Sequence, residues 1–267
     1  YWQVTFLFLG VLVVLCNVAL MFVPETGTAE RAASQRAAQD AMADKMGGQG
    51  PVVKLLIFVG TTVLDPLLSF FRKNGMQIGI TILAFIFLFK IGEAFMGKMS
   101  IVFYKEVGFS KSDIALYSKG LGWITTVTFT LIGGFFALRT GVVRALLISG
   151  IAMAGTNILF SVLAWVGPNE LLFAFAVIVD DLAAAFATVA FVTFISLLVD
   201  RNYTATQYAL LASIGTLGRT LLASSSGALV DGLGGDWGLF FILTAIMVIP
   251  SLLLLWKLRH RLQNLAK

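Results

Sequence analysis

Three charged side chains lie deep inside long apolar stretches of this 267-residue sequence. Asp180 and Asp181 follow one apolar run, and Arg219 lies about midway along the next. A charge near the centre of a bilayer costs roughly 3 kcal/mol on insertion scales, so such residues normally face the interior of a helix bundle or a watery cavity. Two acids on one helix and an arginine on the next are typical of the polar lining of a transport pathway.

Three acids are candidates for proton coupling: Asp180, Asp181 and Glu93. Adjacent helical residues point about 100° apart, so only one of the two aspartates is expected to face the centre of a cavity. Two neighbouring acids also disfavour joint ionisation, and a carboxyl group that can be neutral suits a proton-coupled carrier. Glu93 has a structural alternative, because it lies three residues after Lys90 and can pair with it on one helix face.

Four side chains are candidates for holding an anionic substrate: Lys90, Lys119, Gln207 and Arg219. The guanidinium group of Arg219 is suited to bidentate contact with a carboxylate. The turn at residues 200–203 lies about 20 residues after Asp180 and about 16 before Arg219, so at a rise of 1.5 Å per residue the two depths agree to roughly one helical turn. The geometry therefore permits an acid–arginine pair across the cavity.

Composition places the chain in the membrane. It is 58% hydrophobic and 12% charged, with a mean hydropathy of +0.93, whereas a soluble domain is about a quarter charged. The apolar runs have the length of bilayer-spanning helices, roughly 20 residues, and not the alternating segments of about ten residues that make a membrane barrel. The predicted fold class is an all-α membrane protein.

Other function classes find no support. Cys16 is the single cysteine and His260 the single histidine, which argues against a disulfide and a structural zinc site. The glycine-rich segment 232–238 has Trp237 where a dinucleotide fingerprint needs its last glycine, and no strand precedes it. No nucleophile–base arrangement exists, so we expect no enzyme, cofactor or metal. The net charge of +5 fits membrane topology better than a nucleic-acid partner.

The chain divides into three predicted parts. Residues 1–23 form one transmembrane helix. Residues 24–75 form a linker that is polar and flexible or loosely helical over 25–50. From residue 51 onward an interfacial amphipathic helix fits better than the alternative of a spanning helix, because Gly60, Asp65 and Pro66 interrupt the apolar run. Residues 76–267 form a bundle of six helices, whose predicted bounds are 76–99, 114–138, 142–166, 171–199, 204–230 and 237–256.

Intramembrane charge is uneven over these six segments. The first, second, fourth and fifth carry it, whereas 142–166 has a charge only at its end and 237–256 has none. We expect the four polar helices to line a cavity and the other two to face lipid. The rule that cytoplasmic loops are rich in lysine and arginine places the linker and the carboxy terminus in the cytoplasm. The residues then on that side are Arg31, Arg36, Lys45, Lys54, Arg72, Lys73, Arg139, Arg144, Arg201, Lys257, Arg259, Arg261 and Lys267.

Residues 134–144 resemble the cytoplasmic loop motif of the major facilitator superfamily. The matching positions are Gly134, Arg139, Gly141 and Arg144, which the resemblance makes candidates for a conformational role. Leu138 stands where that motif usually has an aspartate, so the usual charge network of the loop is altered.

A more specific resemblance, over residues 65–240, is to the AmpG-like muropeptide permeases, which are related to acetyl-coenzyme A transporters. It rests on the runs DP (65–66), FFR (70–72), FKIGEA (89–94), GFSK (108–111), TATQYALL (204–211), GRTL (218–221) and SG (226–227). The run at 204–211 is the most specific. Asp180-Asp181 departs from the Glu-Asn-like pair expected in these permeases, which leaves the substrate open.

The resemblance implies two helical bundles, of which this chain supplies the last helix of the first and all of the second, so the missing partner is the amino-terminal bundle of the same protein. It also implies monomeric, proton-coupled import of anhydromuropeptides across a bacterial inner membrane. Two alternatives remain: a carrier for another anionic substrate such as acetyl-coenzyme A, and a non-transporting signalling or scaffold protein that kept the fold. A single cavity lined by the four polar helices would favour a carrier.

Overall fold

The computed structural model describes residues 2–20, 60–200 and 203–265, together with isolated positions between 22 and 57. These residues fall into two units, Tyr1–Asp65 and Pro66–Lys267. The first unit contains α1 (Trp2–Leu20), an apolar helix whose described side chains are exposed, as suits a segment surrounded by lipid. It also contains a short π-helical turn, η1 (Gly60–Leu64). The predictions for Arg201 and for most of the linker at 25–50 lie outside the described residues.

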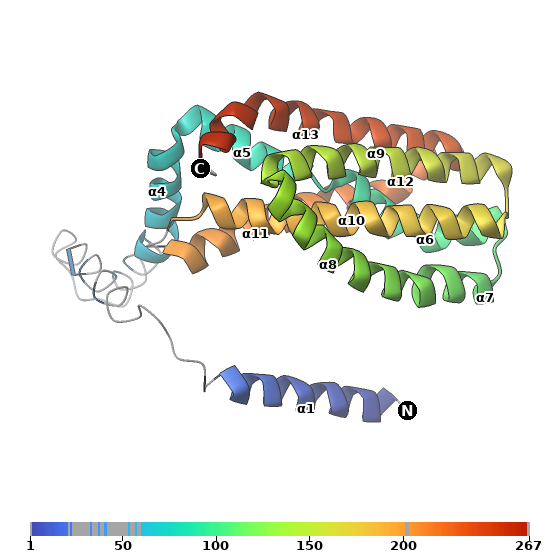
Figure 1. The fold of residues 1–267 in the computed structure, drawn as a ribbon, viewed down its shortest axis with the longest axis horizontal. Coiled ribbons are helices and arrows are strands. Elements are labelled where there is room, and N and C mark those ends of the chain that lie inside the picture. The colour runs from blue at the N-terminus through green and yellow to red at the C-terminus, as the bar shows by residue number, and fades with distance from the viewer. Residues whose placement is uncertain are drawn as a thin grey trace. The chain divides into compact units, whose positions relative to one another are not determined.

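The second unit is a helix bundle (Figure 1). Among the described residues, five helices, or continuous runs of helices, are long and apolar enough to cross a membrane: Met76–Val107, Lys111–Thr140, Val142–Val166, Glu170–Leu198 and Trp237–Arg259. The elements are α4 (Asp65–Asn74), α5 (Met76–Leu88), α6 (Ile91–Val107), α7 (Lys111–Asp113), η2 (Ile114–Leu121), α8 (Gly122–Thr140), α9 (Val142–Val166), α10 (Glu170–Leu198), α11 (Thr204–Ser224), α12 (Ser226–Gly232) and α13 (Trp237–Leu265).

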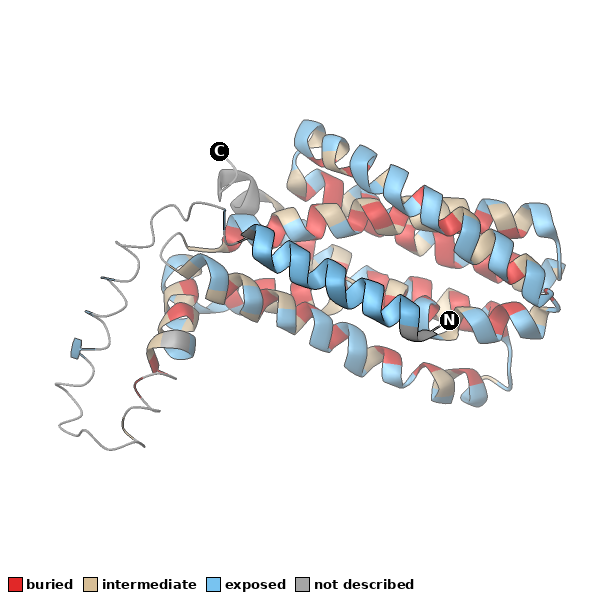
Figure 2. Ribbon diagram, turned by 90° about the horizontal axis from the view of Figure 1, so that it is seen from below, coloured by how far each residue is buried: buried red, intermediate tan, exposed pale blue. Residues whose placement is uncertain are grey.

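Phenylalanine-rich contacts hold the bundle together. Helix α9 packs between α10 and α13, α10 also packs against α8, and α5 packs against α11 and α13. Buried residues lie along the faces where helices meet, and exposed residues cover the outward faces (Figure 2). The exposed residues include many large apolar side chains, as expected of a surface that meets lipid. The largest fully buried aromatic side chains are Phe85, Phe89, Phe103, Phe160, Phe173, Phe240 and Phe241.

The first helix of the bundle is longer than predicted. The predicted loop at 100–113 is wrong, because α6 continues to Val107 and buries Phe103 and Tyr104 in the core. The charged residues of that stretch lie on its outer face, so the stretch is amphipathic and not a loop. Gly108 then ends the helix with φ 110°, a left-handed conformation that glycine adopts without steric cost.

Two breaks interrupt helices that the sequence predicted as continuous. Between α5 and α6, residues 89–90 form a turn. The predicted helix 204–230 divides at Ser225 into α11 and α12. Each of the three serines there donates its hydroxyl to the carbonyl three residues earlier, at 2.6–2.7 Å. Such bonds compete with the backbone ladder and bend helices. Broken membrane helices are tolerated where the freed backbone groups find partners.

Candidate functional site

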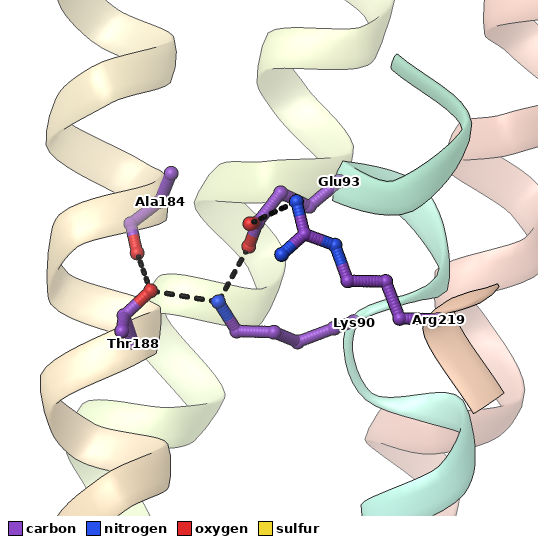
Figure 3. A network of polar contacts seen from close by, with 5 residues as sticks. All are labelled: Lys90, Glu93, Ala184, Thr188 and Arg219. Atoms are coloured by element: carbon purple, nitrogen blue, oxygen red, sulfur yellow. Dashed lines mark hydrogen bonds and ion pairs between the residues drawn. The ribbon is translucent and has the colours of Figure 1, made fainter. Parts of the chain in front are cut away.

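A charged cluster joins three parts of the bundle. Lys90, in the turn between α5 and α6, places its Nζ 2.7 Å from Oε2 of Glu93, in the first turn of α6. The other carboxylate oxygen of Glu93 lies 3.5 Å from a terminal nitrogen of Arg219, on α11. Figure 3 shows the three side chains converging on one another. The predicted Lys90–Glu93 pair is therefore confirmed, and one acid is shared by two cations.

Thr188 completes this cluster and was missed by the sequence reasoning. Its hydroxyl on α10 accepts a hydrogen bond from the Lys90 ammonium at 2.7 Å and donates one to the carbonyl of Ala184 at 2.7 Å (Figure 3). The signal was one hydroxyl within an alanine-rich run, which is also what simple close packing would give. Lys90 is thus held from two sides, by α6 and by α10.

Close helix packing positions the cluster. A Cβ on Gly218, the residue before Arg219, would fall on the backbone carbonyl oxygen of Phe87 in α5. A Cβ on Gly92, the residue before Glu93, would lie 2.7 Å from Val248 Cγ2 and 3.1 Å from Asn157 Nδ2. Glycine at these two positions lets α11 and α6 approach their neighbours closely enough for the charges to meet.

The two adjacent aspartates turn to opposite neighbours. Oδ1 of Asp180 accepts a hydrogen bond from the hydroxyl of Thr156 on α9 at 2.8 Å. Oδ2 of Asp181 accepts one from the hydroxyl of Thr125 on α8. The prediction that the two residues point apart is confirmed. The acid–arginine pairing that the sequence permitted is not formed, because Arg219 pairs with Glu93.

Helix α9 contributes polar groups to the interior of the bundle, although it lacks charge beyond its first turn. It buries four polar side chains, and it supplies the hydroxyl that binds Asp180. Within the described residues, Asn157 Nδ2 is the one buried side-chain nitrogen or oxygen without a hydrogen-bond partner. Whether α9 and α13 face lipid stays a prediction. The buried polar residues of α9 are Ser149, Thr156, Asn157 and Ser161.

Lys119 stands apart from the charged cluster. It is exposed on the π-helical segment η2 and forms no ion pair with any residue that the structure describes. Its assignment to substrate binding stays a prediction. The same described part of the chain contains no group of three or more metal-ligating side chains.

The predicted loop motif lies at the turn between α8 and α9. Gly141, with φ 81°, both ends α8 and begins α9, a conformation that favours glycine. The guanidinium of Arg139 stacks over the ring of Phe135, 4.5 Å from its centroid. Gly134 is half-buried on α8, and Arg144 is exposed in the first turn of α9. The motif's conformational role stays a prediction.

Gln207 has a structural position that argues against the predicted substrate contact. It is 2% exposed, its Nε2 donates to the carbonyl of Pro66 at 2.7 Å, and its Oε1 accepts from the backbone N–H of Asp200 at 2.6 Å. Ser69 also donates to the carboxylate of Asp200, at 3.1 Å. Both ends of the buried amide are thus used to fasten α4 to the turn between α10 and α11. The assignment of Gln207 to substrate binding stays a prediction, and these bonds argue against it.

Replacing Gln207 with alanine is expected to lower the free energy of unfolding by about 2 kcal/mol, because a buried carbonyl and a buried N–H lose their partners. The measurement is the thermal unfolding midpoint of the protein in detergent. Gln77→Ala makes the same chemical change at an exposed position of α5 and should leave the midpoint unchanged. Equal midpoints for the two variants would contradict this structural role.

The comparisons with known proteins agree with the resemblance inferred from the motifs. The chain is 34% identical over 199 residues to AmpG 4 of Rickettsia felis, a candidate transporter, covering 74% of this chain and 47% of that protein. It is 31% identical over 202 residues to the anhydromuropeptide permease of Escherichia coli K12, covering 75% of this chain and 40% of the permease. AmpG 4 of Rickettsia conorii is 29% identical over 260 residues, which are 97% of this chain and 57% of that protein.

The chain spans about half the length of the relatives that it matches. No protein-family model matches it. The relatives are named as transporters and permeases, and the structure has several helices of membrane-spanning length. These two findings confirm the predicted resemblance and the predicted all-helical, multi-pass membrane fold.

Proposed function

We propose that this relative of the AmpG transporters forms the second bundle of a proton-coupled secondary transporter in a bacterial inner membrane. The proposed substrate is an anhydromuropeptide or a similar anionic sugar-peptide. One observation carries the proposal: two cations and one acid meet between apolar helices and stay partly accessible. The exposed fractions of the Lys90, Glu93 and Arg219 side chains are 14%, 20% and 49%.

An excess of positive charge supports an anionic substrate. With Lys90 and Arg219 charged and Glu93 ionised, the cluster carries one net positive charge. Charged residues inside membrane segments usually mark substrate or ion pathways. The peptide part of a muropeptide carries carboxylates, which a guanidinium can hold in a bidentate manner. The Escherichia coli relative is named for anhydromuropeptides.

In the proposed mechanism, two bundles rock about a site near the bilayer midplane. This chain supplies α1, as the last helix of the first bundle, and the six-segment second bundle. Lys90, Lys119 and Arg219 attract the substrate, and one of Glu93, Asp180 and Asp181 carries the proton. The breaks after α5 and α11 support movement within the bundle, because discontinuous helices form the sites of many such carriers. The linker and the carboxy terminus lie in the cytoplasm, and the carrier works as a monomer.

Transport in a defined system tests this proposal. The gene product that contains this chain is reconstituted into lipid vesicles, and uptake of radiolabelled anhydromuropeptide is followed under an imposed proton gradient. We expect accumulation that a protonophore abolishes and that unlabelled anhydromuropeptide prevents. If acetyl-coenzyme A, and not unlabelled anhydromuropeptide, prevents the uptake, the substrate is a different anionic compound. No uptake of either compound by correctly inserted protein would contradict a transport function and favour a scaffold.

A further inference from the structure

We infer that Glu93 and an anionic group of the substrate compete for one guanidinium, that of Arg219, so that protonation of Glu93 opens the anion site. This inference rests on the proposed transport function and identifies which of the three candidate acids is linked to the substrate. It follows from how differently the two cations of the cluster are held.

Lys90 is already held by two short contacts. Its ammonium group contacts both the Glu93 carboxylate and the Thr188 hydroxyl at 2.7 Å, and its side chain is 14% exposed. One of the three N–H donors of the ammonium group remains, and burial of the side chain restricts an anion's access to it. Lys90 therefore holds Glu93 in place on α6 and compensates the charge of its carboxylate.

Arg219 is held loosely and from one side. Its contact with Glu93 spans 3.5 Å, longer than the 2.7–2.9 Å of a close charge-assisted hydrogen bond. About half of its side chain is exposed. A guanidinium has five N–H donors in a planar fork, so most of its donors remain open to a second partner. Arg219 is thus the cation of the cluster that can accept a substrate carboxylate.

Glu93 is the acid that shares a cation with the substrate. Asp180 and Asp181 are directed to threonine hydroxyls on α9 and α8, and neither forms an ion pair with a described residue. The charged groups around Glu93 are Lys90 from the α5–α6 turn, Arg219 from α11, and Asp180 of α10, whose charge is close enough to interact with it. Of the three acids, only Glu93 exchanges a partner when substrate binds.

The exchange balances in charge. A proton from the aqueous side where substrate enters binds the Glu93 carboxylate, and the ion pairs of Glu93 with Lys90 and Arg219 are lost. The cluster then carries two positive charges, and one carboxylate of the substrate binds Arg219 and restores the net charge to one. When the substrate leaves, Glu93 loses its proton to the opposite side and pairs with Arg219 again. One proton therefore accompanies each anionic group.

The experiment measures exchange of labelled for unlabelled anhydromuropeptide across vesicles without a gradient, over a series of pH values. In the unmodified protein the apparent affinity should fall by up to about tenfold per unit of rising pH, because one proton is bound with each anion. Glu93→Gln mimics the neutral acid. Its affinity should be independent of pH, its exchange should persist, and its accumulation under a proton gradient should be lost.

Two controls separate this inference from its rivals. Asp231→Asn removes an exposed acid of α12 and should behave as the unmodified protein does. Asp180→Asn should keep the pH dependence, because an amide oxygen can still accept from Thr156. If Glu93→Gln is absent from the membrane, the double variant Lys90→Gln/Glu93→Gln removes the unpaired cation as well, and the same loss of pH dependence is expected.

The outcomes are distinguishable. If the unmodified protein accumulates the muropeptide and the Glu93 variants keep its pH dependence, the competition is refuted while the transport function stands. If Asp180→Asn removes the pH dependence instead, the proton-carrying acid lies on α10. If the unmodified protein does not move the muropeptide at all, the proposed function fails, and this inference fails with it.

Discussion

Replacing Arg219 with alanine is expected to abolish muropeptide uptake, with a loss of at least about a hundredfold. Hydrogen bonds to a charged group contribute about 1.5–3 kcal/mol each, and a guanidinium can give two of them to one carboxylate. Here the substrate carboxylate loses its proposed partner, whereas Glu93 keeps its ion pair with Lys90. Arg219→Lys should retain measurable uptake with roughly tenfold weaker apparent affinity, since a point charge replaces a planar fork.

Uptake into vesicles, normalised to the amount of protein in the membrane, measures both effects. Arg72→Ala is the matched control, because this arginine is exposed on α4, outside the charged cluster. It should transport at close to the unmodified rate. Uptake by Arg219→Ala that equals the control would show that the substrate is held elsewhere, and Lys119 would be the next residue to replace.

Adding a single methyl group at Gly218 is expected to separate α11 from α5 and to lower the free energy of unfolding by about 3 kcal/mol. Overpacking a tight contact costs typically 1–3 kcal/mol, and here the new Cβ would meet the backbone carbonyl of Phe87, which no side-chain rotation can move away. Because Arg219 is the next residue, the Gly218→Ala variant should also lose uptake. Thermal unfolding in detergent and vesicle uptake measure the two effects.

Gly155→Ala provides the control for this substitution. A Cβ at Gly155, on α9, would meet no atom within 4 Å. Alanine is also the better helix former by about 1 kcal/mol, so this variant should be as stable as the unmodified protein or slightly more so. A Gly218→Ala variant with an unchanged unfolding midpoint would show that α11 does not approach α5 as closely as the structure has it.

Hydropathy was sufficient to predict most of the membrane helices. A spanning helix needs a long apolar run, and this requirement is strong enough that α9, α10 and the continuous η2–α8 segment begin and end close to their predicted residues. The breaks in the first and fifth segments were harder to predict. Residues 89–90 include no proline or glycine, and a serine run such as 224–226 is compatible with an unbroken helix as well as with a bend.

The partners of the charged residues could be predicted only in part. Lys90, which directly precedes α6, and Glu93, in its first turn, pair because a separation of three brings their side chains to the same side, and this separation is visible in the sequence. For Arg219, the depth in the membrane can be estimated from the sequence, but the rotation of each helix about its own axis cannot. That rotation determines which acid the side chain faces, and in the structure Arg219 faces Glu93 and not the aspartates of α10. The same rotation also decides that Gln207 is buried against α4, although a polar residue near a helix end is compatible with either position.

The opposed hydrogen bonds of Asp180 and Asp181 have a mechanical consequence for α10. One carboxylate is tied to α9 and the next to α8, so a turn of α10 about its own axis that relaxes one bond stretches the other. The two bonds together therefore resist rotation of α10 about its axis at this level. Thr188 lies about two turns further along the same helix, so its bond to Lys90 connects the charged cluster to this restrained part of α10.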